Sequence, residues 1–408
     1  MSDTYRALLL ENLHADADPA LLAHGPLDIE RLPGSPERSE LLEAASRVHA
    51  LGIRSRTQVD LEVLEAAPEL LAVACFCIGT NQVELETAAE RGVPVFNAPF
   101  ANTRSVAELT LASIVMLMRG IPRKMQAIRG GEWLKSAEGS HEVRGKKLGI
   151  VGYGNIGSQL SVLASGHGMH VYYFDQGPKL AHGNARAVHS LDELLELSDV
   201  LTLHVPSTSR TRGMIDADAI ARMKPGSFLI NHARGDLVDI EALASALASG
   251  HLAGAAVDVF PEEPKTASES FESALTNFDN VILTPHIGGS TLEAQAAIGR
   301  DAADKLGRYL FEGATMQAVN FPEVEPGPLE PGRVRLTCAH VNAPGFLTRL
   351  NEAVSAAGAN IAAQQLQTLG DVGYAVADLE GDLPIDFAGS VRAIEGTVRA
   401  RLLSATQR

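Results

Sequence analysis

A glycine-rich segment near the middle of the chain stands between an apolar run and a stretch of helical spacing. Gly152, Gly154 and Gly157 belong to the segment Gly-Tyr-Gly-Asn-Ile-Gly, which follows the run 147–151 and opens into helix-like spacing over 158–164. In such a turn the first glycine permits a tight bend, the second lets the backbone approach a pyrophosphate, and the third lets helix and strand pack closely. The free N–H groups at the start of the helix then bind the phosphates. The spacing therefore predicts a dinucleotide site.

An acidic residue ends the next predicted strand. Asp175 follows the run 169–174, about twenty residues beyond the glycines, where dinucleotide-binding units carry an acid. A carboxylate there accepts hydrogen bonds from the ribose hydroxyls and repels a 2′-phosphate, so we expect NAD rather than NADP. The alternative is an ordinary turn residue at a strand end. The place of Asp175 after the glycine-rich unit favours the cofactor role.

Three further side chains follow predicted strands and combine a guanidinium, a carboxylate and an imidazole. They are Arg234, Glu263 and His286. An imidazole with a pKa of about 6.5 transfers protons well near neutral pH, and a carboxylate bonded to its other nitrogen orients it. A guanidinium can hold a carboxylate at two points. Beside a nicotinamide, these groups suit the interconversion of 2-hydroxy and 2-keto acids. His286 alone would be an ordinary strand-end histidine, but the combination favours catalysis.

These residues depend on a central α/β unit whose strands end in polar side chains. Besides the strand before the glycines, the runs 200–206, 227–231, 255–260 and 281–286 predict strands. In open α/β sheets, ligands bind at the carboxyl ends of parallel strands. We therefore expect a Rossmann-type, doubly wound parallel sheet over residues 104–289.

A second α/β unit precedes the central one. Its apolar runs, each followed by a turn or helix-like spacing, are 5–10, 48–53, 71–75 and 93–97. A long apolar helix over 106–119 is expected to cross into the central unit, and the helical stretch ending near Gly313 is expected to pack back onto the first. The first domain is thus predicted to be flavodoxin-like and discontinuous, over 1–103 and 290–320, with the Rossmann-type domain inserted in it.

The last part of the chain is predicted to form a small domain of its own. Proline and glycine dominate residues 322–332 and indicate a semi-rigid linker. Beyond it, the pattern strand–helix–strand–strand–helix–strand predicts a ferredoxin-like βαββαβ domain over 333–408. This domain carries no catalytic combination of residues, so a regulatory or assembly role is favoured.

Composition limits the possible partners. The chain has 408 residues, 45% hydrophobic and 21% charged, which suits a soluble protein with large cores. Its net charge of −16 argues against nucleic acid or an anionic membrane as partner. The start of the chain lacks a signal-peptide pattern, and no apolar run reaches the roughly 20 residues of a membrane span. Three cysteines suit a reducing compartment, and Cys75 and Cys77 lack zinc spacing. We expect a cytoplasmic protein without a metal site.

The order of these motifs resembles the D-isomer-specific 2-hydroxyacid dehydrogenases. The segments that carry the resemblance are 75–81, 97–100, 102–108, 152–157, 231–235, 258–263 and 285–290. The similarity covers nearly the whole chain and is greatest to members of the family that end in an ACT domain. It implies NAD-dependent oxidation of 3-phosphoglycerate to 3-phosphohydroxypyruvate, the first step of serine synthesis, by a homotetramer that L-serine inhibits. Some related enzymes also reduce 2-oxoglutarate.

The resemblance also implies roles for single residues. Arg234 would bind the substrate carboxylate, and Glu263 would support His286, the acid/base. The expected NAD contacts are Gly152, Gly154, Asn155, Ile156, Gly157, Asp175, His232, Ala233, Arg234, Asp258, His286, Gly288 and Gly289. The expected substrate contacts are Arg54, Ile78, Gly79, Thr80, Asn81 and Lys135, and the expected L-serine contacts are His340, Asn342 and Asn360. The alternatives are a surface lysine for Lys135 and a turn residue for Asn360.

Two positions depart from the family pattern, and two other functions stay open. His232 stands where a small residue is usual, and either faces the nicotinamide or fills space. Residues 32–34 lack the basic residue of relatives, so phosphate binding would depend more on Arg54 and Lys135. A glyoxylate or hydroxypyruvate reductase is disfavoured by the C-terminal domain and by the pair Arg54 and Arg56. An NAD-sensing corepressor is disfavoured by the lack of a basic patch.

Overall fold

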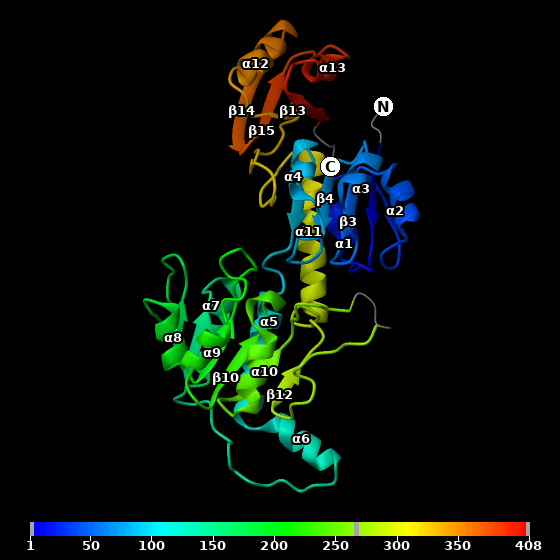
Figure 1. Ribbon diagram of the computed structural model, residues 1–408. Helices are drawn as coiled ribbons and strands as arrows, with labels where there is room; N and C mark the ends of the chain where they lie inside the picture. Colours follow the sequence, from blue (N-terminus) through cyan, green and yellow to red (C-terminus); the bar gives the residue numbers. More distant parts are fainter. Residues whose placement is uncertain (1–3, 265–268, 405–408) are drawn as a thin grey trace. The chain divides into compact units, whose positions relative to one another are not determined.

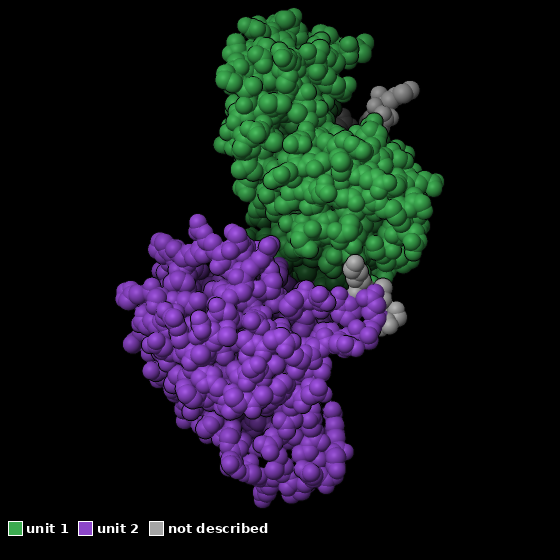
Figure 2. Space-filling view, in the orientation of Figure 1, with its two compact units in different colours: residues 1–101, 295–408 green, residues 102–294 purple. Residues whose placement is uncertain are grey.

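The chain divides into two compact units, each with its own parallel sheet. The computed structural model describes residues 4–264 and 269–404 (Figure 1). The first unit contains the described residues up to Ala101 and from Gln295 onward, and the second contains those from Asn102 to Ala294 (Figure 2). The outermost domain limits predicted from the sequence, 1 and 408, lie outside the described residues.

The first unit contains a five-stranded parallel sheet in the order β2-β1-β3-β4-β5, the 2-1-3-4-5 order of flavodoxin-like sheets. Its strands are Tyr5–Leu9 (β1), Leu27–Arg31 (β2), Ala50–Ile53 (β3), Ala72–Cys75 (β4) and Val95–Asn97 (β5). Its helices are Ala17–Leu22 (α1), Arg38–Ala45 (α2), Leu61–Ala66 (α3), Leu85–Glu90 (α4) and Leu292–Glu312 (α11), the last of which enters from the second unit. Residues of α1 and α11 share one hydrophobic core, and residues of α2, α3 and α4 share another. Alternate residues of β1 enter the two cores, so helices cover both faces of the sheet.

The second unit contains a seven-stranded parallel sheet in the order β12-β11-β10-β9-β6-β7-β8. Its strands are Lys147–Val151 (β6), His170–Phe174 (β7), Arg186–Ala187 (β8), Val200–Leu203 (β9), Ser227–Asn231 (β10), Leu252–Val257 (β11) and Val281–Leu283 (β12). Its helices are Thr103–Met118 (α5), Ile121–Arg129 (α6), Asn155–Gly166 (α7), Leu191–Leu197 (α8), Ala217–Arg222 (α9) and Ile240–Ala248 (α10). This is the Rossmann-type order, which reverses between β6 and β9. Ligands of such sheets bind outside the strand ends at that reversal.

Helices cover both faces of the second sheet as well. Residues of α5 and α7 share a hydrophobic core on one face, and residues of α8, α9 and α10 share a core on the other. All four residues of β9 are buried, as expected for a parallel strand covered on both sides. In the described part of the chain, no single helix is long and apolar enough to cross a membrane, although the bent pair α5 and α6 together passes that test of length and composition.

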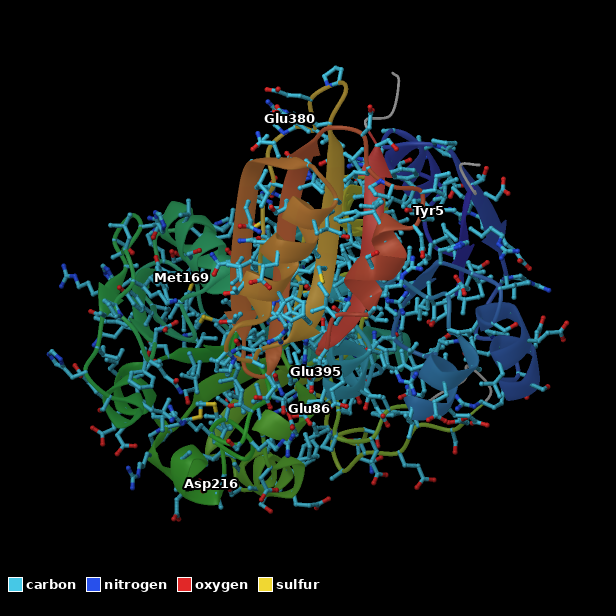
Figure 3. The ribbon with its side chains drawn as sticks, turned by 90° about the horizontal axis from the view of Figure 1, so that it is seen from above. Tyr5, Glu86, Met169, Asp216, Glu380 and Glu395 are labelled. Atoms are coloured by element: carbon cyan, nitrogen blue, oxygen red, sulfur yellow. The ribbon has the colours of Figure 1, made fainter. Side chains whose placement is uncertain are left out.

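The C-terminal part forms a four-stranded antiparallel sheet in the order β14-β15-β13-β16. Its strands are Val334–Val341 (β13), Asn360–Leu369 (β14), Val372–Glu380 (β15) and Thr397–Ser404 (β16), and its helices are Phe346–Ala356 (α12) and Phe387–Arg392 (α13). The predicted βαββαβ element order is therefore present. Glu380 and Glu395, at opposite ends of this sheet, are labelled in Figure 3.

Buried polar contacts join the C-terminal sheet to the rest of the first unit. Arg335 is 1% exposed, forms an ion pair with Asp378 and donates hydrogen bonds to the carbonyls of Glu312 and Gly327. The Tyr374 hydroxyl donates to the carbonyl of Gly313 at 2.9 Å. Breaking such contacts would leave buried polar groups unpaired, which is costly. The C-terminal part, expected from the sequence as a separate body, therefore packs as part of the first unit.

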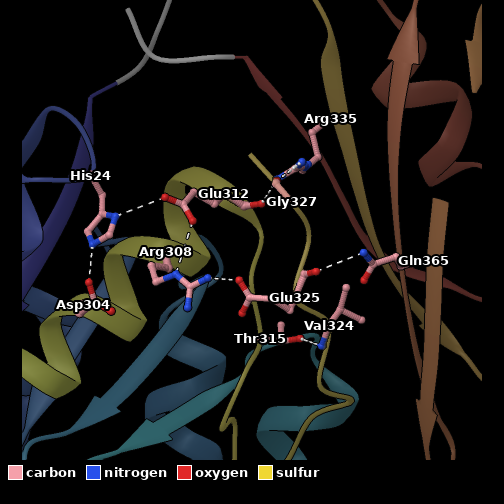
Figure 4. A network of polar contacts seen from close by, with 10 residues as sticks. All are labelled: His24, Asp304, Arg308, Glu312, Thr315, Val324, Glu325, Gly327, Arg335 and Gln365. Carbon is pink, nitrogen blue, oxygen red and sulfur yellow. Dashed lines mark hydrogen bonds and ion pairs between the residues drawn. The ribbon is translucent and has the colours of Figure 1, made fainter. Parts of the chain in front are cut away.

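A second set of contacts holds the linker between α11 and β13. His24 lies between the carboxylates of Asp304 and Glu312 on α11 (Figure 4). Arg308 on the same helix forms an ion pair with Glu325 of the linker, and the Gln365 side chain of β14 donates to the carbonyl of Glu325. The linker is thus held by α11 through the side chain of Glu325 and by β14 through its carbonyl.

Candidate active site

The glycine-rich turn joins β6 to α7 and has room for phosphates. Gly152 has a φ of +90°, and a Cβ there would lie 2.5 Å from the carbonyl oxygen of His204. A Cβ on Gly157 would lie 2.2 Å from the carbonyl oxygen of Gly152, so both positions require glycine. A Cβ on Gly154, in contrast, would meet no atom within 4 Å. Gly154 is also the N-cap of α7 and provides no side-chain cap. Uncapped N–H groups next to open space suit the pyrophosphate of NAD.

Asp175 lies where the sequence predicted it, at the end of β7 and beside the glycine-rich turn. Its carboxylate accepts hydrogen bonds from the backbone N–H groups of Tyr153, at 2.8 Å, and Gly177, at 3.2 Å. The ammonium of Lys179 lies 3.8 Å from one carboxylate oxygen. The turn and the acid therefore form one local structure. Sequence reasoning did not identify Lys179, which places a positive charge beside Asp175.

His286 and Glu263 form a direct pair in the second unit. The His286 Nδ1 atom lies 2.8 Å from a carboxylate oxygen of Glu263, whose other oxygen accepts from the backbone N–H of Phe260 at 3.0 Å. The hydrogen bond to Glu263 raises the pKa of His286 against the opposing effect of burial. Burial opposes ionisation of Glu263, but the hydrogen bonds from His286 and Phe260 outweigh it and lower the pKa of this carboxyl. The pair therefore favours an imidazolium next to a carboxylate.

The loop that carries His286 is strained and is fixed by Asp258. His286 has a φ of +54°, a left-handed backbone conformation that residues other than glycine rarely adopt. Asp258, which is 1% exposed, accepts hydrogen bonds from the Thr284 hydroxyl and the backbone N–H groups of Ile287 and Gly288. Asp258 thus holds the loop on both sides of His286, a role that the sequence did not reveal. Its expected contact with NAD stays a prediction.

Arg234 lies in the turn after β10, which the side chain of Asn231 closes. Asn231 donates to the carbonyl of Arg234 at 2.8 Å and accepts from the N–H of Ala233 at 3.1 Å. The positive charge of Arg234 lowers the pKa of Glu263 and opposes protonation of His286. The second unit therefore brings together the three side chains that the sequence singled out for catalysis.

His232 is buried on the inner side of the same turn. Its Nδ1 atom lies 3.1 Å from the hydroxyl of Thr110 on α5, and burial lowers its pKa to about 4, so the ring is neutral near pH 7. His204, at the end of β9, also has a lowered pKa, of about 3, because of burial. Its Nδ1 is buried without a partner among the described residues. His232 does fill space, and its contact with NAD stays a prediction.

Comparisons with known proteins agree with this geometry. A family described as "D-isomer specific 2-hydroxyacid dehydrogenase, NAD binding domain" matches residues 111–288. The D-3-phosphoglycerate dehydrogenase of Escherichia coli strain K12 is 52% identical to the chain over 403 residues, 98% of each protein. The chain belongs to the D-isomer-specific 2-hydroxyacid dehydrogenases.

Solved structures show the same fold at lower identity. The D-lactate dehydrogenase of Aquifex aeolicus, solved with NAD and lactic acid, is 26% identical with a TM-score of 0.65, and the match covers 76% of this chain and 97% of that one. A glyoxylate reductase from Paecilomyes thermophila is 28% identical with a TM-score of 0.68, and the match covers 78% and 99%. Family membership makes the chain an NAD-dependent oxidoreductase and confirms the expected cofactor.

The residues expected to bind the family's substrate follow strands of the first unit, with one exception. Arg54 comes directly after β3, and the segment 78–81 comes shortly after β4. The Asn97 side chain donates to the carbonyl of Ile78 at 2.6 Å, which supports that segment. Within the described residues, the guanidinium of Arg54 has no hydrogen-bond or ion-pair partner. Lys135 instead lies in the second unit, exposed in the irregular stretch after α6.

The three residues expected to bind L-serine do not meet within one chain. His340 is 3% exposed, and its ring stacks on that of Phe346 with the ring centroids 3.8 Å apart. The Asn342 side chain donates to the carbonyl of Gly370 at 3.0 Å. Asn360 pairs in the sheet with Glu380, whereas His340 pairs with Gly373. Asn360 therefore lies at the end of the sheet opposite to His340 and Asn342. One copy of the chain cannot place all three around one amino acid.

Proposed function

We propose that the protein oxidises D-3-phosphoglycerate to 3-phosphohydroxypyruvate with NAD, as the first step of serine synthesis. The observation that carries the chemistry is the 2.8 Å contact between His286 and Glu263 beside Arg234. The substrate rests on the E. coli relative, which is 52% identical and matches along 98% of this chain. The glyoxylate reductase is only 28% identical and covers 78% of it, so the runner-up function has weaker support.

The chemistry follows from the residues of the second unit. The glycine-rich turn and Asp175 would hold NAD, which would supply the hydride acceptor for C2 of the substrate. The free Nε2 of His286 accepts the proton of the C2 hydroxyl, and Glu263 stabilises the imidazolium that forms. Arg234 holds the substrate carboxylate and so fixes the position of C2. In the reverse direction His286 returns the proton to the new hydroxyl.

The substrate phosphate needs a cation of its own. Arg54 is the candidate, because its guanidinium has no partner among the described residues and residues 32–34 carry no basic side chain. Lys135 is a second candidate, with an exposed ammonium. A guanidinium binds phosphate oxygens at two points and so contributes directional recognition as well as charge.

We also propose the domain roles that the sequence indicated. Residues 104–289 form the NAD-binding domain, inserted in a substrate-binding domain formed by 1–103 and 290–320, and residues 333–408 form an ACT domain that binds L-serine. Because Asn360 lies opposite His340 and Asn342, one serine site would take residues from two copies of the chain. This supports a homo-oligomer, and a tetramer is the form that the family resemblance implies.

The proposed substrate is tested by comparing the oxidation of D-3-phosphoglycerate with the reduction of several 2-keto acids. We expect efficient NADH formation from D-3-phosphoglycerate, and we expect the enzyme to reduce phosphohydroxypyruvate much faster than glyoxylate or hydroxypyruvate. Reduction of 2-oxoglutarate at a lower rate than phosphohydroxypyruvate also fits the proposal. A preference for glyoxylate would establish the reductase instead, and NAD binding without any turnover would favour the corepressor.

The serine site is tested with Asn342→Ala. We expect L-serine to inhibit the unchanged protein, and Asn342→Ala to weaken inhibition at least tenfold without loss of basal turnover. Such a change corresponds to about 1.4 kcal/mol, within the usual range of allosteric coupling. Asn351→Ala is a matched control, since Asn351 lies on α12 and bonds to Gln364. Removing the C-terminal part is a poorer test, because Arg335 and Tyr374 anchor it to the first unit. L-serine without effect at millimolar levels refutes the proposed site.

A further inference from the structure

The backbone just after β1 is unusual in the first unit. Glu11 has a φ of +62° and Asn12 a φ of +50°, so two successive residues other than glycine adopt the left-handed conformation. Such residues are rare and persist only where the surrounding contacts hold them. The N–H of Glu11 donates to the carbonyl of Gly34 at 2.9 Å. This conformation directs the Glu11 side chain to the loop that follows β3.

Glu11 is a buried acid whose partners are backbone N–H groups of that loop. It is 7% exposed, and one carboxylate oxygen accepts from the N–H of Arg54 at 3.2 Å and of Thr57 at 2.9 Å. The other oxygen accepts from the N–H of Arg56 at 3.2 Å. Burying a carboxylate is unfavourable unless hydrogen bonds replace its hydration. Three such bonds from the four-residue segment 54–57 replace it and fix the course of that segment.

Gln82 bonds to the backbone carbonyl of the same residue, Arg54. Its side chain is 3% exposed and donates to the carbonyl of Arg54 and, at 3.3 Å, to the carbonyl of Gly79. The N–H of Arg54 is therefore held by Glu11 and its carbonyl by Gln82. Gln82 also links Arg54 to the segment 78–81, the other expected substrate-binding segment of this unit.

We propose that Glu11 and Gln82 are positioning residues that fix the direction of Arg54 for binding the substrate phosphate. This inference rests on the function proposed above. Neither residue needs to touch the substrate, because both act through the backbone of Arg54.

Electrostatics and positioning make opposite predictions for Glu11→Gln. Removing a negative charge near a phosphate site would by itself strengthen anion binding. The amide of glutamine, however, would place a donor against the N–H of Arg56, which now bonds to an oxygen. If positioning dominates, Glu11→Gln weakens phosphate binding despite the loss of negative charge.

The test compares Michaelis constants for phosphorylated and unphosphorylated substrates. We expect Glu11→Gln, and Gln82→Met as a second variant, to raise the KM for phosphohydroxypyruvate about tenfold. The KM for hydroxypyruvate and the KM for NADH should change less than about twofold, because neither involves Arg54. Glu11→Asp should stay closer to the wild-type KM for phosphohydroxypyruvate, since it keeps a carboxylate.

Asn320→Asp provides a matched structural control. Asn320 is 9% exposed, accepts from the N–H of Val95 and donates to the carbonyls of Leu85 and Val93, so it also makes three backbone bonds in the first unit. We expect Asn320→Asp to lower the melting temperature without changing the KM for phosphohydroxypyruvate. If Glu11→Gln does not fold, Gln82→Met decides alone.

Each outcome has a definite meaning. An unchanged or lowered KM for phosphohydroxypyruvate in both variants overturns the inference, as does an equal rise for hydroxypyruvate. A wild-type protein without turnover of the phosphorylated substrate refutes the proposed function itself and removes the basis for this inference. An active wild type with unaffected variants refutes only the roles of Glu11 and Gln82.

Discussion

Replacing Glu263 by glutamine should move the pH dependence of the reaction. Glu263 accepts a 2.8 Å hydrogen bond from His286 and holds the pKa of that imidazole above its usual range. A neutral amide keeps the shape of the side chain but not its charge. The imidazolium loses its partner, so the pKa of His286 should fall.

The solvent exposure of the His286–Glu263 pair determines how far the pKa of His286 should fall. A hydrogen bond to a charged group contributes about 1.5–3 kcal/mol when it is well shielded from water. The side chains of His286 and Glu263 are 52% and 36% exposed, so solvent screening reduces this to about 1 kcal/mol. That free energy corresponds to an about fivefold weaker binding of the proton by His286 in the variant, and so to a lower pKa. Loss of ring orientation should also lower the plateau rate, by roughly tenfold.

The assay is the initial rate of NADH formation or consumption across pH. Oxidation needs the neutral imidazole, so its rate rises with pH through the pKa of His286, and reduction needs the imidazolium, so its rate falls through the same pKa. In Glu263→Gln both midpoints should move together to lower pH, as an about fivefold weaker binding of the proton requires. Glu262→Gln, at the exposed neighbouring carboxylate, should move neither. Midpoints that stay fixed or move upward in Glu263→Gln would refute this account of the pair.

Two further predictions concern the cofactor and the stability of the first unit. Asp175→Ser should narrow the preference for NAD over NADP, measured as the ratio of kcat/KM values, by at least about tenfold. The substitution removes a carboxylate that repels a 2′-phosphate and leaves Lys179 beside the site. If the variant and the wild type prefer NAD to the same degree, Asp175 does not select the cofactor. His24 has its pKa raised from 6.5 to about 9 by hydrogen bonds to Asp304 and Glu312, so its stabilising effect is complete below pH 6.5 and is lost as pH rises through about 9. Because both carboxylates are partly exposed, the stabilisation amounts to about 1–2 kcal/mol. His24→Gln should therefore make the denaturant midpoint of unfolding less dependent on pH between pH 6.5 and about 9. An unchanged pH dependence of the midpoint would contradict this role of His24.

Much of the second unit could be predicted from the sequence, because its strands are short apolar runs that end in polar residues. The strand Ser227–Asn231 has the bounds that its apolar run predicts, and Asp175 lies against the glycine-rich turn as its spacing indicates. The meeting of Arg234, Glu263 and His286 follows from topology, since parallel strands deliver their carboxyl ends to one edge of the sheet.

Elements with weak patterns were missed. Strand β2 reads Leu-Asp-Ile-Glu-Arg and is largely exposed, so it lacks the apolar run that marks the other strands of its sheet. Helix α6 follows a glycine in the left-handed conformation and has no buried residue among its nine, so no buried apolar run marks it. Ile121, Met125 and Ile128 do recur at helical spacing, and this pattern could have indicated the helix.

The supporting contacts of the site could not be predicted, because they join residues far apart in sequence. Glu11 bonds to N–H groups 43 to 46 positions away, and Asp258 bonds to a loop about thirty positions away. Periodicity shows which face of an element is buried, but not which buried acid meets which loop. The anchoring of the C-terminal part by Arg335 and Tyr374, which donate to the carbonyls of Glu312 and Gly313, was hidden for the same reason.

The turnover of His286→Gln tests whether His286 transfers the proton in the oxidation of D-3-phosphoglycerate. We expect kcat to fall at least about a hundred-fold, the usual contribution of a general acid/base, while calorimetry shows unchanged NAD binding by the variant. A variant that binds NAD normally and retains near-normal kcat with D-3-phosphoglycerate would exclude this role of His286.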